Sequence, residues 1–456
     1  MIDIKILTQL IQIYTKASLE KGIFPFVKKF YLNKFFEPQR NQAVEQIIHR
    51  LLAKKQLNST DTAIICFSVF ENETIYKEFL ATLPRSLQIL IEKLLWVEAM
   101  TDEEMEKILN ESITTPSRYA PQEKELKNEF YFFSVSLYYI YVYPRTNYFV
   151  LSLHPLFKQV LMEFYPKPVH YYFIQLDKIP ETRYRFTAET LVMQQMPKLL
   201  SYYMQDGIKY SGKGRPADAT LNKLQRTLGF TEFFPGEEEF LGKTRNMLMA
   251  GLLYSFKINN INIDTVSVIK DLFTKQYLKL NTSQFILMHL KGWTYMDAHD
   301  YNENTEHNFF EVLKQLPPGK WVSAENLMDF IQCRFIPLKP IANWALNNRL
   351  FFEKGIHYIE KKYAAGNANM LVQYPFIKGT IFLLASFGLI EIAYEGVNTK
   401  EFGKTFYAAY DGLQYFRLTA LGAYVLGLSP SYEPAEPQQQ NKVQFSEDSL
   451  IILAEG

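Results

Sequence analysis

Residues 316–331 read LPPGKWVSAENLMDFI, and residues 415–428 read YFRLTALGAYVLGL. The Pro-Pro-Gly triplet at positions 317–319 ends one helix and forces a turn. Ser323 is then placed as the N-cap of a second helix. The later stretch begins as a strand and becomes a helix at Thr419, with apolar residues at helical spacing. Together the two stretches predict a helix-turn-helix that is closed by strands and a last helix.

Helix, turn, helix, strand pair and closing helix is the element order of a winged-helix unit, which binds DNA or another protein. We therefore predict a winged-helix domain over residues 305–429. Residues 82–186 show a similar order, with two helices, a long hairpin around the PRT turn and a closing helix that has Pro155 in its first turn. Residues 187–304 predict a helix-turn-helix domain with a helical connector.

The two ends of the chain complete the predicted organisation. Residues 1–81 show helical periodicity, whereas residues 430–456 form a Pro- and Gln-rich linker followed by two short strand-like runs. Two such strands cannot bury a core, so they add to a neighbouring sheet or begin a further domain. The predicted fold class is α+β, predominantly α: tandem winged helices with a helical N-terminal part.

Single residues give local predictions inside these domains. Pro197 lies in the middle of a helical pattern and predicts a kink or a break. Gly229 and Gly388 are each placed just past a helix end, as C-terminal caps. The polar segment ESITTPSRYAPQEKELKN, residues 111–128, is predicted to be a surface loop.

Composition limits the classes of function. The chain has 456 residues and a formal net charge of +1, so any site for nucleic acid must be a local patch. The two cysteines, Cys66 and Cys333, lie far apart, which excludes a Cys-based zinc site and is typical of a reducing compartment. No signal peptide and no apolar run long enough to span a membrane is apparent. We expect a cytoplasmic protein.

The most basic short segment that is placed like a recognition helix runs from residue 208 to residue 230. Five cations and Asp218 give it a net charge of +4. On the predicted helix, Thr220, Lys223 and Thr227 share one face, next to Asn222 and Arg226. Cations would contact phosphates, and Asn222 and Gln225 could reach base edges. The predicted DNA-binding residues are Lys209, Lys213, Arg215, Asn222, Lys223 and Arg226. The alternative is a solvated basic helix face.

Enzyme chemistry finds little support in the sequence. GIKYSGKG, residues 207–214, has the glycine and lysine spacing of a phosphate loop but lacks the Ser or Thr that would bind Mg²⁺. A polar run contains Asp297, His299, Asp300 and His307, yet no second pair of ligands is placed near it. We therefore expect a non-enzymatic protein with no cofactor and no metal.

Three motifs resemble the winged-helix region associated with the N-terminal domain of XPB-type helicases in bacterial proteins. PPGKWV, residues 317–322, resembles the turn that opens the last winged helix of that family. FGL, residues 387–389, is similar to its Leu-Gly-Leu step, with Phe for Leu, and RLTALG, residues 417–422, is similar to its closing motif. More loosely, residues 211–230 resemble the family's second helix-turn-helix. The resemblance implies DNA-associated work with a helicase, or as the N-terminal part of a helicase-related protein, and no catalytic residues.

Two functions follow as expectations. The first is a DNA-binding or DNA-associated protein that docks on duplex DNA through the basic segment, with a helicase or other protein as a further partner and no membrane. The second is a protein–protein interaction scaffold whose winged helices do not bind DNA. The near-neutral net charge favours the scaffold, and the local +4 charge favours DNA.

Overall fold

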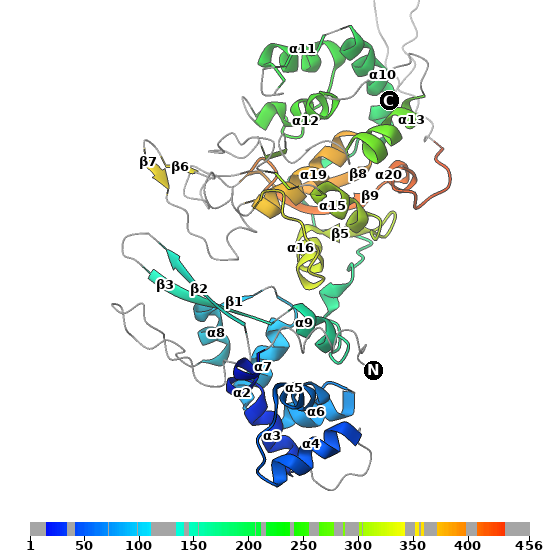
Figure 1. Cartoon of the computed structure of the whole chain (residues 1–456). Coiled ribbons are helices and arrows are strands. Elements are labelled where there is room, and N and C mark those ends of the chain that lie inside the picture. The colour runs from blue at the N-terminus through cyan, green and yellow to red at the C-terminus, as the bar shows by residue number, and fades with distance from the viewer. Residues whose placement is uncertain are drawn as a thin grey trace, which may run out of the picture. The chain divides into compact units, whose positions relative to one another are not determined.

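A computed structural model describes most of the chain and divides it into two compact units. The first unit comprises Met1–Tyr172, Asp329–Phe335 and Lys362–Ala365, and the second comprises Phe173–Met328, Ile336–Lys361 and Gly366–Gly456. The residues that the structure describes are 15–33, 42–71, 73–97, 99–110, 134–140, 146–153, 155–205, 207–210, 216–237, 241–254, 264–277, 286–287, 301–302, 304–342, 352–354, 357–359, 372–397 and 408–433. The elements are labelled in Figure 1.

The first unit begins with a group of short helices packed around aromatic side chains (Figure 1). Phe30 and Phe79 meet edge to face with ring centroids 5.6 Å apart, and the Tyr31 hydroxyl lies 2.6 Å from Ser68 Oγ. Such pairs let large rings be buried while the tyrosine hydroxyl keeps a hydrogen-bond partner. The helices are α2 (Lys16–Lys21), α3 (Phe24–Asn33), α4 (Gln42–Leu52), α5 (Ser59–Ser68), α6 (Glu73–Thr82) and α7 (Arg85–Leu94).

A small antiparallel sheet completes the first unit. It contains β1 (Met100–Thr101), β2 (Ser134–Ile140) and β3 (Thr146–Ser152) in the order β1-β3-β2. Helix α8 (Asp102–Leu109) follows β1, and α9 (Pro155–Leu161) follows β3. The predicted hairpin and its closing helix, with Pro155 in the first turn, are confirmed. The surface loop predicted at 111–128 lies outside the described residues.

The second unit is built on a four-stranded antiparallel sheet with the order β4-β8-β9-β5. The helices that pack with it are α15 (Thr305–Leu313), α16 (Ala324–Cys333), which begins in this unit, α19 (Tyr374–Ser386) and α20 (Ala420–Val425). The four strands are β4 (Tyr184–Phe186), β5 (Trp321–Ser323), β8 (Ile390–Tyr394) and β9 (Leu413–Leu418). A separate two-stranded sheet contains β6 (Phe352–Lys354) and β7 (His357–Ile359).

The chain ahead of β4 contacts one edge of the four-stranded sheet, and β4 itself forms the other edge. Leu176 exchanges two backbone hydrogen bonds with Trp321 of β5, 2.9 and 3.0 Å long. A few residues later, β4 pairs with β8 at the opposite edge, with Arg185 opposite Ala393. The bridge at Leu176 occupies the backbone groups of Trp321 on the β5 edge.

The local predictions at the ends of the helices are confirmed. Ser323 Oγ accepts a hydrogen bond from Asn326 N at 3.0 Å, as an N-cap does. Thr419 Oγ1 accepts from Gly422 N at 3.0 Å and caps α20. Gly388 follows α19 with a φ of +73°, in the left-handed region that favours glycine. A Cβ at this position would lie 2.8 Å from Glu189 Cα, so the close approach of the chain also requires glycine.

Helices α10 (Glu189–Met204), α11 (Asp218–Leu228) and α12 (Thr244–Leu253) lie together at the top of Figure 1. They are followed by α13 (Thr265–Asp271) and a π-helical turn, Leu272–Gln276. Of the kink or break predicted at Pro197, the break is excluded, because α10 runs through this residue without interruption. Pro197 is exposed, so the carbonyl of Met193 that loses its helical partner is on the solvent side.

The described part of the chain is predominantly helical with small antiparallel sheets, which confirms the predicted class of α+β, mainly α. None of the described helices is both long enough and apolar enough to cross a bilayer. The short strands predicted near the C-terminus lie outside the described residues.

Candidate nucleic-acid interface

The predicted recognition helix, α11, packs against α10 as an antiparallel pair. Near the C-terminus of α10, the Tyr202 ring lies under the ammonium of Lys223, with Nζ 4.9 Å from the ring centroid. Further back on α10, Gln195 Nε2 donates to the carbonyl of Gly229 at 3.4 Å. Because the later residue of α10 meets the earlier residue of α11, the two helices run in opposite directions.

Helix α11 is amphipathic and ends where the sequence predicts. Leu221 and Leu224 are buried, whereas Asn222, Lys223 and Arg226 are exposed. Gly229 follows the helix with a φ of +63°, so the predicted C-terminal glycine cap is confirmed. The exposed face therefore carries the amide and the cations that were selected from the sequence.

The prediction that Thr220 shares the exposed face of Lys223 is wrong. Thr220 is only 4% exposed, and its hydroxyl accepts a hydrogen bond from Lys209 N at 3.1 Å. Side chains three residues apart on a helix point about 60° apart, which is enough to place one at the exposed face and the other at its buried edge. Thr220 anchors the preceding loop instead of facing a ligand.

That loop joins α10 to α11 and is closed like a hairpin. Tyr210 and Pro216 form an antiparallel bridge, and Ala217 N donates to the carbonyl of Lys209 at 2.9 Å. Lys209 is exposed beside this closure. Two predicted DNA-binding residues, Lys213 and Arg215, belong to the loop and lie outside the described residues.

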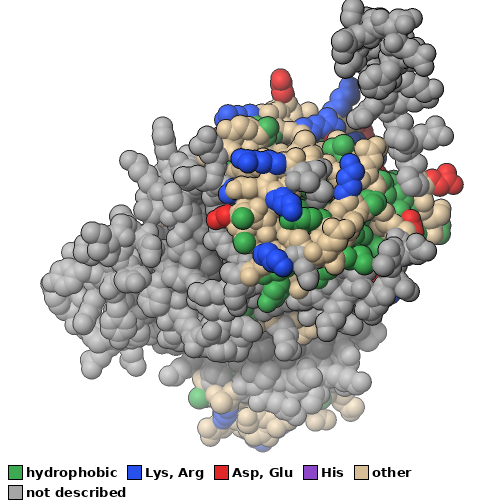
Figure 2. Space-filling model, turned by 90° about the horizontal axis from the view of Figure 1, so that it is seen from above, with side chains coloured by type: hydrophobic (Ala, Val, Ile, Leu, Met, Phe, Trp, Pro, Cys, Tyr) green, Lys and Arg blue, Asp and Glu red, His purple; other side chains and the backbone are tan. Residues whose placement is uncertain are grey.

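The outward charge of the α10–α11 pair is positive. Lys209, Lys223 and Arg226 are exposed, and none forms an ion pair within the part of the chain that the structure describes. Asp218 lies 3.6 Å from Lys243, so this carboxylate is already matched by another cation. Seen from above, Lys and Arg side chains spread over this face and Asp and Glu lie toward its rim (Figure 2).

Sequence reasoning missed two residues on this surface. Lys198 is exposed on α10, one helical turn before Tyr202, and was not selected because α10 as a whole is not basic. Tyr202 was not selected because its role depends on its contact with Lys223 across the helix pair. The i, i+4 spacing of Lys198 and Tyr202 was the one feature of the sequence that could have indicated that they share a helix face.

A buried ionic cluster fixes the helices beneath this surface. Glu232 is 8% exposed and accepts hydrogen bonds from the backbone N–H groups of Arg245 and Asn246, at 2.7 and 3.2 Å. Its carboxylate therefore sits at the positive N-terminal end of α12. Burial raises the pKa of Glu232 to about 7, although the two N–H groups and the Arg245 charge lower it in part.

The Arg245 side chain joins three parts of the second unit. It is fully buried and donates to Thr231 O at 3.0 Å, to Gln195 Oε1 at 3.0 Å and to Ser386 O at 3.2 Å. Phe186 and Phe230 lie against the guanidinium, with ring centroids 5.1 and 5.3 Å from Cζ. Burial lowers the pKa of Arg245 to about 10, so it stays charged at neutral pH. It links α10 and α12 to the end of α19.

The metal and phosphate-loop candidates have less support in the described part of the chain. The described residues hold no group of three or more His, Cys, Asp and Glu side chains that could bind a metal ion. Of the polar run considered as a metal site, His307 is exposed on α15, and Asp297, His299 and Asp300 lie outside the described residues. Gly242, in the short GKT sequence of residues 242–244, belongs to a 3-10 turn ahead of α12.

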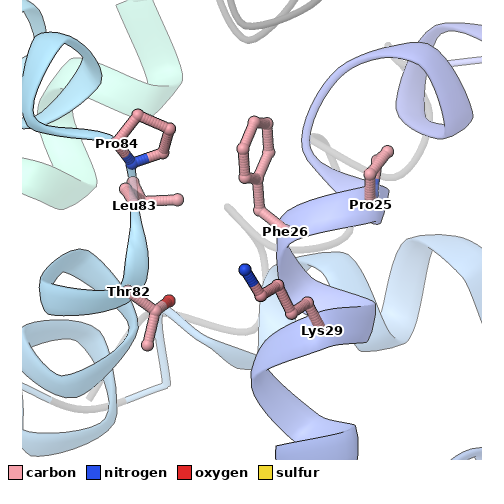
Figure 3. Close-up of a pocket in the computed structure, with 6 residues that line it drawn as sticks. All are labelled: Pro25, Phe26, Lys29, Thr82, Leu83 and Pro84. Atoms are coloured by element: carbon pink, nitrogen blue, oxygen red, sulfur yellow. The ribbon is translucent and has the colours of Figure 1, made fainter.

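The first unit has a groove of about 420 Å³ between α3 and the turn that joins α6 to α7. Phe26 of α3 faces Leu83 and Pro84 across it, with Lys29 and Thr82 nearby (Figure 3). The Thr82 hydroxyl donates to the carbonyl of Phe79 at 2.7 Å, so it is already engaged. The groove lacks the converging polar groups that orient a small ligand.

Comparison with known proteins identifies no relative: no family model, no curated protein and no solved structure matches this chain.

Proposed function

We propose that this protein is a non-enzymatic, duplex-DNA-binding protein and that it docks on the sugar–phosphate backbone through the α10–α11 helix pair. One observation carries the proposal: Lys209, Lys223 and Arg226 are exposed on one helix-loop-helix segment and are not matched by carboxylates in the described part of the chain. Unmatched cations on a compact helical surface favour binding to phosphate oxygens. Lys213 and Arg215 in the connecting loop add to the charge, and Asn222 is the proposed base contact.

The arrangement of strands supports a tandem winged-helix architecture for the protein. In the second unit, helix α15, strand β5, helices α16 and α19, strands β8 and β9 and helix α20 occur in this order along the chain, with strands β6 and β7 inserted between α16 and α19. In the first unit, α7, β1, α8, β2, β3 and α9 follow in a comparable order. The neighbour orders β5-β9-β8 and β1-β3-β2 correspond, since in each the last strand lies between the other two. We also propose that the protein acts in the cytoplasm together with a helicase-related partner.

A salt titration of duplex binding tests the DNA proposal. The affinity of the wild-type chain for a short duplex is measured between 50 and 300 mM salt. It is compared with that of a variant carrying Lys209→Gln, Lys213→Gln, Lys223→Gln and Arg226→Gln. If all four side chains contact phosphates, the slope of log affinity against log salt falls by about 3 to 4. A wild-type chain with no salt-dependent binding contradicts the proposal.

The matched control changes the same charge elsewhere. Lys28, Lys29, Lys77 and Lys93 are all exposed in the first unit, and replacing them with Gln removes the same number of cations. We expect the control variant to keep the wild-type salt slope. An equal loss in both variants would mean that net charge alone drives binding.

A second candidate function is a protein–protein interaction scaffold. Three large apolar side chains are exposed on the same helical group: Leu191 is 36% exposed, Met204 41% and Tyr254 49%. Exposed apolar groups among polar ones are common at protein interfaces. Replacing these three residues with Ser would abolish partner binding in a scaffold, but it would leave the salt slope of DNA binding unchanged.

A further inference from the structure

We propose that the phosphate-binding strip extends from α11 onto α10, with Lys198 as a further phosphate contact and Tyr202 as the positioning residue for Lys223. The inference rests on the proposed DNA-binding function and adds two residues to it. It follows from the way in which α10 and α11 are paired.

The antiparallel pairing brings Lys198 level with Arg226. Tyr202 meets Lys223 near one end of the pair, and Gln195 meets Gly229 near the other. Lys198 lies between Gln195 and Tyr202 on α10, as Arg226 lies between Lys223 and Gly229 on α11. Both are exposed, so the two cations stand at the same height along the helix pair.

Lys198 is available to a ligand. It is exposed and forms no ion pair within the described ranges. The other exposed residues on its stripe of α10 are uncharged: Leu191, Gln194, Ser201 and Gln205. A stripe with one cation and no carboxylate does not repel a phosphate chain, and its amide and hydroxyl groups can donate to phosphate oxygens.

The Tyr202 ring packs against Gly207, and the Lys223 ammonium lies over the ring. A Cβ on Gly207 would lie 2.4 Å from Cε2 of the Tyr202 ring, so the ring packs directly on the glycine. Gly207 N also donates to the carbonyl of Tyr202 at 3.0 Å. The Lys223 ammonium rests 4.9 Å from the ring centroid. A cation over an aromatic face keeps N–H donors free on its outer side, while its side chain is confined.

Two measurements test this inference on the full chain. The first is the salt slope for duplex binding by Lys198→Gln, which we expect to fall by about 0.9, the value for one phosphate contact. Lys28→Gln, at an exposed lysine of the first unit, is the control and should keep the wild-type slope. An unchanged slope in Lys198→Gln overturns the role of Lys198.

The second measurement is a double-mutant cycle between Tyr202→Leu and Lys223→Gln. Tyr202→Leu should weaken DNA binding about threefold when Lys223 is present and should have no effect when position 223 is Gln. Tyr202→Phe keeps the aromatic face and should bind like the wild type. An equal loss in both backgrounds overturns the positioning role, because it would show a general packing defect.

A readout without DNA separates this inference from the proposed function. The ε-methylene protons of Lys223 should show an upfield ring-current shift in the free protein, which Tyr202→Leu removes and Tyr202→Phe keeps. Absence of the shift in the wild type overturns the positioning role whether or not DNA binds. If the shift is present but the wild type fails to bind duplex DNA, the proposed function is wrong and the role of Lys198 falls with it.

Discussion

Replacing Glu232 by Gln should change how the stability of the second unit depends on pH. Glu232 is buried at the start of α12, and burial raises its pKa from the ordinary 4.5 to about 7. Below pH 4.5 the carboxyl is protonated in both folded and unfolded chains. As the pH rises toward 7, the unfolded chain releases this proton while the folded chain keeps it, so folding loses stability over that window.

The size of the effect follows from the shift. A difference from 4.5 to about 7, at about 1.36 kcal/mol for each pKa unit, corresponds to about 3 kcal/mol lost between pH 4.5 and pH 7. Glu232→Gln cannot titrate and should lack this contribution. Gln retains only one of the two acceptor oxygens that serve Arg245 N and Asn246 N, so a constant offset in stability is also expected. The pH dependence is therefore the diagnostic quantity.

The assay is urea unfolding at several pH values from 4.5 to 8, for both the wild type and Glu232→Gln. A Trp96→Phe background removes the tryptophan of the first unit and leaves the three of the second unit, Trp293, Trp321 and Trp344, to report on it. The difference in unfolding free energy between the two proteins should move in favour of the variant by about 3 kcal/mol as the pH rises. A difference that stays constant with pH would refute the reasoning, because it would mean that Glu232 ionises as it does in water.

Three further variants test the packing of the second unit by urea unfolding. Gly388→Ala should cost at least 1 to 2 kcal/mol, because φ is +73° and the added Cβ would meet Glu189; a neutral result would show that the turn can relax. Thr419→Ala should cost about 1 kcal/mol of unfolding free energy, because the hydrogen bond from Gly422 N is lost. Thr419→Ser keeps the hydroxyl and should be nearly neutral. Equal effects of the two variants would exclude a capping role. Arg245→Met should cost about 3 kcal/mol, since two buried acceptors, Gln195 Oε1 and Ser386 O, and the part-buried Thr231 O lose their donor; stability equal to wild type would mean that water replaces the guanidinium.

Local signals in the sequence predicted the ends of the elements well. Ser323 and Thr419 accept the backbone hydrogen bonds that their positions indicate, and Gly229 and Gly388 take left-handed conformations after their helices. These features depend on a few neighbouring residues, so the chain itself carries the information. At Pro197, for which a kink or a break was predicted, the structure excludes the break, because α10 continues through this residue.

Residues of the candidate site were predictable only in part. The exposed residues of α11 were selected correctly as exposed, since an amphipathic helix shows its polar face in its spacing. Thr220 was misplaced because it sits at the edge of that face, where the neighbouring loop decides its environment. Lys198 and Tyr202 were missed because their relation to Arg226 and Lys223 exists only once α10 and α11 pair.

The helical character of the chain, the helix caps and the hairpins were predictable from short-range spacing and backbone chemistry. The burial of a single charged side chain was not, because it depends on packing between distant segments. Arg245 reads as a surface cation in KTRNM, yet it is fully buried and joins α10, α12 and α19. The pairing of β4 with β8, about two hundred residues later in the chain, was not predictable either. Such contacts arise from burying apolar area between distant segments, and no local pattern encodes their partners.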